Sequence, residues 1–223
     1  MPIAARWRIL QIADSAFPTG GFAHSAGLEA AVHLGEVRSA GQFESVLPAH
    51  LWNVGHTSLP FVAAAHQAPE SAWALCAWID ACLTSHVANR ASRTQGRAFL
   101  ATSAEVFEDA RIAELATAAR SREMRPHLAP LFGATLRILG VDHLEALALH
   151  LQHALRGMTS AAVRLGVVGP LEAQRLQVRH GQTLDAVLQE CASLRPEQAS
   201  SVAPLLDLFG ATHDAMYSRL FQS

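Results

Sequence analysis

The chain has 223 residues, of which 50% are hydrophobic and 16% are charged, and its formal net charge is −2. A general nucleic-acid-binding domain usually carries a clear positive excess, so this balance argues against that class, and nucleic acid is not an expected partner. The high apolar fraction predicts a large core together with apolar surface that a partner covers.

Cysteine usage and the distribution of apolar residues indicate a cytoplasmic protein. The three cysteines, Cys76, Cys82 and Cys191, include no CxxC pair, and their odd number does not fit a disulfide framework. The N-terminus lacks the apolar run of a secretory signal. The most apolar segment, residues 71–83, contains Asp80 and is too short to span a bilayer, so we expect no membrane partner.

Residues 14–29 form the most unusual segment of the chain. Pro18 and the pair Gly20-Gly21 predict that a first helix ends here and that the backbone turns tightly with positive φ. Ser25 is then predicted as the N-cap of the next helix, with Glu29 in its opening turn. The result is a rigid elbow between two helices.

The elbow carries Phe22 and His24, and three interpretations of it differ. A phosphate-binding loop requires a lysine after the glycines, and none is present. A catalytic His24 requires a partnered nucleophile or acid, which the neighbouring sequence does not offer. By pattern alone, the segment is a structural turn with Phe22 buried.

A helix is predicted to begin after Ser39, because Ser39 and Gln42 form the pattern of a capping box. This helix runs toward Trp52, with Gly55 as its expected end and Pro60 at the start of the next helix. Further helical segments are separated by single prolines and a glycine, at Pro69, Pro126, Gly140, Pro170 and Pro196.

Arg90, Arg93 and Arg97 follow a spacing of three and four, which places them on one face of a helix. A solvated face is the ordinary interpretation of such a stripe. The neighbouring Gln95 and Gly96 suggest more, since a glycine inside a helix costs about 1 kcal/mol relative to alanine and therefore indicates close approach of another backbone.

A long helix is predicted through residues 144–165, with an apolar stripe on one face and Arg156 and Arg164 beside it as a solvated or partner-facing edge. The stripe consists of Leu144, Leu147, Leu151, Leu155, Met158, Ala162 and Leu165. His150 and His153 lie three residues apart on the same helix and could share a metal ion. Without a third ligand such a site is weak, so no metal site or cofactor is predicted.

The C-terminal segment also shows helical spacing. Its predicted apolar face consists of Leu205, Leu208, Phe209, Thr212, Met216 and Leu220 and ends in Phe221. His213, Tyr217 and Arg219 lie off this face, and tyrosine and arginine are frequent hot-spot residues of interfaces. Because an exposed tail is entropically costly to order, residues 204–223 are predicted to be a partner-binding helix or tail.

Period-2 alternation is almost absent, so the predicted fold class is all-α. Helices joined by short turns predict one domain, residues 1–223, forming an irregular helical bundle of roughly 8–11 helices. Neither G-x-S-x-G nor H-E-x-x-H occurs, and the chain is predicted to be non-catalytic.

Four blocks together resemble the UreF family of urease accessory proteins, and they span nearly the whole chain. The first is LQIADS at residues 10–15 with PTGGFAHS at 18–25 and GLE at 27–29, and the second is RASRTQGRA at 90–98. The third is SAAVRL at 160–165 with GPL at 169–171, and the fourth is HDAMYSRLFQS at 213–223. One departure is that Ser58 stands near the position where many bacterial members carry an aspartate before proline.

The resemblance implies an all-helical, often dimeric adaptor that acts without catalysis. Its expected partners are the accessory protein UreD (UreH in some organisms), the GTPase UreG and apo-urease, with nickel handled by the complex rather than bound tightly by this chain. We expect UreG to contact Phe22, His24, Ser25, Glu29, Arg90, Arg93, Gln95, Gly96 and Arg97. We expect UreD/UreH to contact His213, Tyr217, Ser218, Arg219, Leu220 and Phe221.

The alternative function is activation of the UreG GTPase. Arg90, Arg93, Arg97 or Arg219 could each supply an inserted arginine, and the sequence does not distinguish among them.

Overall fold

Helices supply the regular structure of this computed structural model, which describes residues 3–121 and 124–222 and contains no strand in those ranges. The all-α prediction is confirmed. The N-terminal half contains α1 (Ile3–Ala13), η1 (Gly21–Ala23), α2 (Leu28–His33), α3 (Ala40–Thr57), α4 (Leu59–Gln67), η2 (Pro69–Ser71), α5 (Ala72–Cys82) and α6 (His86–Phe107). The C-terminal half contains α7 (Ala110–Ala118), α8 (Leu128–Ile138), α9 (His143–Arg164), α10 (Pro170–Arg179), α11 (Gly181–Cys191), η3 (Pro196–Gln198), α12 (Pro204–Thr212) and η4 (His213–Ala215).

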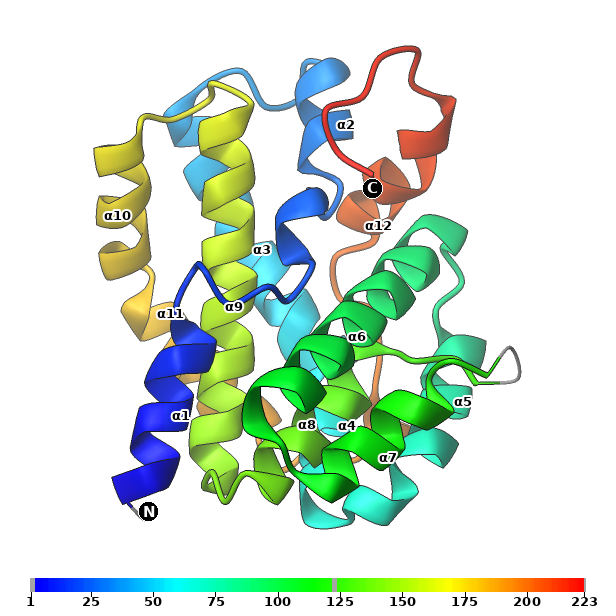
Figure 1. Cartoon of the computed structure of the whole chain (residues 1–223). Helices are drawn as coiled ribbons and strands as arrows, with labels where there is room; N and C mark the ends of the chain where they lie inside the picture. Colours follow the sequence, from blue (N-terminus) through cyan, green and yellow to red (C-terminus); the bar gives the residue numbers. More distant parts are fainter. Residues whose placement is uncertain (1–2, 122–123, 223) are drawn as a thin grey trace.

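The core forms where α4, α8 and α9 pack together, and α9 runs the height of the molecule (Figure 1). Every residue of α8 from Ala129 to Leu136 is buried, so this stretch is enclosed on all sides and lies at the centre. The C-terminal α12 packs against α2 and α6, which brings the end of the chain beside its first quarter (Figure 1).

Gly96 lies where α6 passes directly under the segment that leads into α8. A β-carbon at this position would stand 1.9 Å from the carbonyl oxygen of Pro126, a backbone atom that cannot rotate away. The close approach of another backbone expected from the sequence is therefore confirmed, and the approaching backbone belongs to this chain.

Ser39 is the N-cap as predicted, because its hydroxyl accepts a hydrogen bond from the Gln42 amide. The reciprocal half of the capping box does not form, since the Gln42 side chain accepts from the Arg38 amide instead of the Ser39 amide. Gly55 does not end the helix as predicted, and α3 continues to Thr57. The glycine instead makes room for α11, since a β-carbon there would stand 2.5 Å from Cγ1 of Val187. Pro60 lies in the first turn of α4, where a backbone N–H would have no acceptor within the helix, so the missing N–H of proline costs no hydrogen bond.

The apolar stripe of α9 is buried from Leu147 through Ala162, as its spacing predicts. The prediction is wrong at the first position of the stripe, where Leu144 is 58% exposed. Within the described residues, no helix combines the length and apolar character needed to cross a membrane.

Candidate functional site: a C-terminal clasp on the N-terminal elbow

The elbow between α1 and α2 depends on two left-handed glycines. Gly20 has φ of 76° and precedes η1, and Gly27 has φ of 85° and precedes α2. The prediction that Ser25 is the N-cap is wrong by two positions, because Ala26 with φ of 52° and Gly27 complete the turn. Ser25 still contributes, since its buried hydroxyl accepts a hydrogen bond from the Glu29 amide.

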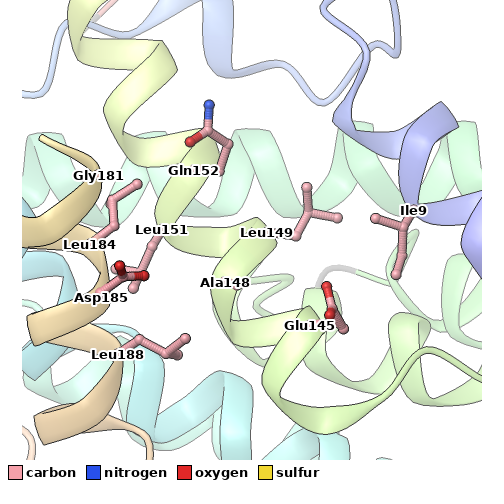
Figure 2. Close-up of a pocket in the computed structure, with 10 residues that line it drawn as sticks. All are labelled: Ile9, Glu145, Ala148, Leu149, Leu151, Gln152, Gly181, Leu184, Asp185 and Leu188. Carbon is pink, nitrogen blue, oxygen red and sulfur yellow. The ribbon is translucent and has the colours of Figure 1, made fainter. Parts of the chain in front are cut away.

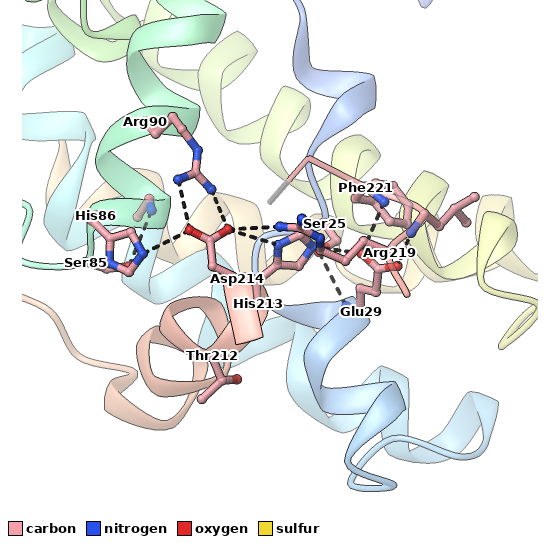
Figure 3. A network of polar contacts seen from close by, with 12 residues as sticks. Ser25, Glu29, Ser85, His86, Arg90, Thr212, His213, Asp214, Arg219 and Phe221 are labelled. Carbon is pink, nitrogen blue, oxygen red and sulfur yellow. Dashed lines mark hydrogen bonds and ion pairs between the residues drawn. The ribbon is translucent and has the colours of Figure 1, made fainter. Parts of the chain in front are cut away.

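Glu29 lies in the first turn of α2, as predicted, and its buried carboxylate binds the C-terminal tail. Its Oε2 lies 2.9 Å from Nε2 of the equally buried His213 and accepts a hydrogen bond of 3.2 Å from the Phe221 amide (Figure 3). Its Oε1 accepts a hydrogen bond from the Leu220 amide. One carboxylate thus satisfies three donors from residues 213–221, and we call this arrangement the clasp.

Asp214 extends the clasp to α6. The Arg90 guanidinium donates to both carboxylate oxygens at 2.7 and 3.0 Å, and Nε2 of His86 lies 3.0 Å away. Arg219 donates to the same carboxylate at 3.2 Å (Figure 3). The Arg90 hydrogen bonds lower the pKa of Asp214 to about 2, so this carboxylate stays charged at neutral pH.

Arg164 at the end of α9 joins the elbow to the tail through aromatic rings. Its guanidinium carbon lies 4.0 Å from the ring centroid of Phe22 and 4.1 Å from that of Phe221. Arg164 also donates to the Phe22 carbonyl, and the Gln222 amide donates to the Ala23 carbonyl at 2.8 Å. Arg164, predicted to lie on a solvated or partner-facing edge, therefore contacts the faces of two aromatic rings of its own chain.

The structure brings together residues that the sequence assigned to two different partners. Glu29 and Arg90 come from the group expected on the UreG side, whereas His213, Arg219 and Phe221 come from the group expected on the UreD/UreH side. These five residues, together with Asp214, form one connected network of polar contacts.

The remaining predicted residues lie around this network. His24 is half-buried, and burial, followed by the charges of Arg90 and His213, lowers its pKa to about 4. Gln95 packs under the turn at Gly20 and Gly21. Gly96 is buried beneath Pro126. The arginines of the stripe differ in exposure, because Arg93 is half-buried whereas Arg97 is exposed.

Two expectations, one about the exposure of Phe22 and one about the length of the C-terminal helix, are wrong. Phe22 is 70% exposed rather than buried, because the elbow rests on α6 through Gln95 and Ala98 and turns this ring outward. The apolar face predicted through Leu220 does not continue as a helix, since α12 ends at Thr212 and the chain turns at η4 to bring His213 to Glu29.

The inward residue of α12 is therefore Leu206, whose carbonyl oxygen lies close to Gly27. Leu205 and Leu208 are 67% and 56% exposed. Beyond η4, the side chain of Tyr217 is fully exposed and Leu220 is 54% exposed, so both side chains project from the clasp into solvent. Ser218 is also exposed, and Ser223 lies outside the described residues.

Sequence reasoning missed a hydrogen-bonded chain beside this site. Nε2 of His127 lies 2.9 Å from Oδ1 of Asp80, and its Nδ1 lies 3.1 Å from Oγ of Ser92. Burial lowers the pKa of His127 despite the neighbouring Asp80, so the ring is neutral and donates through Nε2. The imidazole is completely enclosed, and the Ser92 hydroxyl also accepts from the Leu128 amide. We interpret these hydrogen bonds as a structural link that joins α5, α6 and the segment above Gly96.

His150 and His153, considered above as metal ligands, are occupied by packing contacts. The His150 ring lies 5.3 Å from the ring of Phe132, and Nε2 of His153 lies 3.1 Å from the carbonyl oxygen of Ile12, to which it donates. Burial lowers the pKa of these two histidines to about 4 and about 3. Among the residues that the structure describes, no group of three or more His, Cys, Asp or Glu side chains is arranged to hold a metal ion.

Fold and site together define an all-α protein whose C-terminal tail is clasped onto its N-terminal elbow. A family model described as UreF matches residues 37–180. Urease accessory protein F of Oryza sativa subsp. indica is 36% identical over 219 residues, covering 96% of this chain and 84% of that protein. The chain therefore belongs to the UreF family of urease accessory proteins.

Other relatives cover the chain as fully. Urease accessory protein F of Arabidopsis thaliana is 36% identical over 222 residues, covering 98% of this chain and 92% of the relative. The urease accessory protein UreF of Mycobacterium tuberculosis is 29% identical over 216 residues, covering 96% of this chain and 97% of the relative. The similarity extends beyond the family model, which begins after the elbow and ends before the tail.

Proposed function

We propose that this chain is a non-catalytic cytoplasmic adaptor that binds UreD/UreH, recruits the GTPase UreG to apo-urease and so supports nickel insertion. The observation that carries the proposal is the clasp in a chain of the UreF family. It joins the elbow and the tail into one surface from which Phe22, Tyr217 and Leu220 project. Exposed aromatic residues beside arginines are typical of interface hot spots, because they combine a large contact area with directed hydrogen bonds.

Tyr217 is the residue through which we test the contact with UreD/UreH. Its side chain is fully exposed, so Tyr217→Ala removes a partner contact without removing an internal one. We expect the variant to fold normally and to bind UreD/UreH about 30-fold more weakly, as truncation of a tyrosine hot spot does. Co-expression with UreD/UreH, followed by pull-down and affinity measurement, checks this.

The matched control is Leu171→Ala on α10, since Leu171 is also strongly exposed, at 75%, and lies away from the clasp. If Tyr217→Ala binds UreD/UreH as tightly as the control variant, the tail is not the UreD/UreH surface. Performing the pull-down with UreG, with and without GTP, tests the recruiting role separately.

For UreG, Arg97 is the arginine of the stripe best placed to meet a partner. Arg90 and Arg219 are bound to Asp214, whereas Arg97 is exposed and has no ion pair within the described ranges. Together with the half-buried position of Arg93, the same observation favours Arg97 over the other candidates for the alternative function, activation of UreG by an inserted arginine. Single-turnover GTP hydrolysis by UreG, with this chain and with its Arg97→Ala variant, separates recruitment from activation.

Dimer formation within the complex is part of the proposal, and α1 supports it. Ile3, Trp7 and Leu10 are 77%, 64% and 56% exposed and lie on one face of this helix. Next to α1 is a groove of about 350 Å³, floored by residues such as Leu149 and Leu184 and bordered by the carboxylates of Glu145 and Asp185 (Figure 2).

A two-fold axis can place the α1 face of each copy against the groove of the other, because an isologous interface pairs two different patches reciprocally. The exposed Arg6 on α1 complements the acidic border of the groove. We expect Trp7→Glu to shift the protein from dimer to monomer in sedimentation velocity. Leu171→Glu is the control, and a Trp7→Glu protein that remains dimeric would contradict this interface.

A further inference from the structure

The histidines His66 and His143 face each other across the contact between α4 and α9. Their Nδ1 atoms are 3.4 Å apart, and their ring centroids are separated by 5.2 Å with the ring planes at 66° to each other. His66 lies near the C-terminal end of α4 and is 3% exposed, whereas His143 is the first residue of α9 and is partly exposed. Neither residue takes part in the clasp or in the apolar groove.

The hydrogen bonding of His66 fixes which of its nitrogens is free. Its Nε2 lies 2.9 Å from the carbonyl oxygen of Val141, and a carbonyl can only accept, so Nε2 carries the proton. Two imidazole nitrogens 3.4 Å apart can hydrogen-bond only if one of them is unprotonated, and His66 already holds the proton of its ring on Nε2. Its Nδ1 then presents an unprotonated lone pair toward His143.

This arrangement has the features of a metal-binding imidazole pair. Two nitrogens bound at about 2.0–2.1 Å to one tetrahedral ion stand about 3.3 Å apart, close to the separation of the two Nδ1 atoms. Metal-binding histidines usually donate their other N–H group to a carbonyl or carboxylate, as Nε2 of His66 does to Val141. Near the pair, the charge of Asp142 favours a cation and that of Arg137 opposes it.

We propose that His66 and His143 form a low-affinity, exchangeable site for one first-row divalent ion of the kind that prefers imidazole, such as Ni²⁺ or Zn²⁺. Both Nδ1 atoms donate their lone pairs to the ion, and water completes the coordination. In the metal-free pair, the protonated Nδ1 of His143 donates a hydrogen bond to the unprotonated Nδ1 of His66. On metal binding, this proton leaves to solvent while Nε2 of His143 takes one up, so that no net proton is released.

The test uses the full chain carrying Cys82→Ser, because Cys82 is an exposed thiol that would itself bind metal. Zn²⁺ and Ni²⁺ are titrated separately by calorimetry, and Zn²⁺ binding is followed by ¹⁵N NMR of labelled histidines. We expect one equivalent of metal per chain, and in the Zn²⁺ spectra a change at the Nδ1 signals of two histidines, one of which keeps a protonated Nε2.

His143→Gln should lower the affinity by at least about tenfold, since losing a ligand costs no less than losing an outer-shell partner. His33→Gln is the matched control, because His33 is exposed at the end of α2. Binding that is unchanged in His143→Gln, or that shifts only Nε2 signals, would overturn the proposal, as would the absence of binding at millimolar metal. The spectra of the Cys82→Ser protein with both histidines intact decide the question even if a variant at the buried His66 fails to fold.

Discussion

Replacing Gly96 by alanine should destabilise the protein by about 3 kcal/mol or more, the upper end of what overpacking costs. The added methyl group would stand 1.9 Å from the Pro126 carbonyl oxygen and 2.8 Å from the carbonyl carbon of His127. Both are backbone atoms, so α6 or the segment before α8 has to move. Chemical denaturation followed by circular dichroism measures the loss, with the midpoint shifting at an unchanged slope.

The control is the same substitution at Gly157 in the middle of α9. A β-carbon at Gly157 has no neighbour within 4 Å, so Gly157→Ala should stabilise the protein by about 1 kcal/mol through helix propensity. Two glycines inside long helices thus give effects of opposite sign. Equal effects of the two substitutions would mean that α6 does not pack against the Pro126 segment as described.

Replacing Glu29 by glutamine should release the C-terminal tail while leaving the helical core folded. The carboxylate accepts from His213 and from the amides of Leu220 and Phe221, and the amide nitrogen of glutamine cannot accept. Whichever way the glutamine turns, at least one donor loses its acceptor. A hydrogen bond to a charged group is worth about 1.5–3 kcal/mol, so amide exchange at Leu220 and Phe221 should accelerate by about 10- to 100-fold.

Hydrogen–deuterium exchange resolved to the C-terminal peptide checks this effect. Glu36→Gln is the control, because Glu36 is an exposed glutamate just beyond the same helix. The core helices should exchange as in the unmodified protein. Unchanged protection of the tail amides in Glu29→Gln would show that the clasp does not hold the tail.

The clasp also changes what partner-binding experiments mean. Deleting residues 213–223 removes a proposed partner surface and, at the same time, removes all three donors that bind the Glu29 carboxylate. Loss of UreD/UreH binding after such a deletion therefore does not identify the contact. Substituting Tyr217, which projects into solvent, separates binding from folding.

Local chemistry in the sequence determined the helical architecture. The N-cap at Ser39, the proline in the first turn of α4 and the apolar stripe of α9 each depend on interactions within a few residues, so the sequence alone predicts them. Gly96 also gave a correct signal, because an unfavourable glycine inside a helix implies a compensating contact. The four sequence blocks indicated the family, which the relatives then showed.

Only the tertiary structure decided what these residues contact. Glu29 and His213 are separated by 184 residues, and Arg90 and Asp214 by 124, so no local periodicity relates them. The same limitation explains why Phe22 was expected to be buried and why His66 was never paired with His143. Local sequence encodes which face of a helix is apolar, whereas the packing of the whole chain fixes which polar side chains meet at its edges.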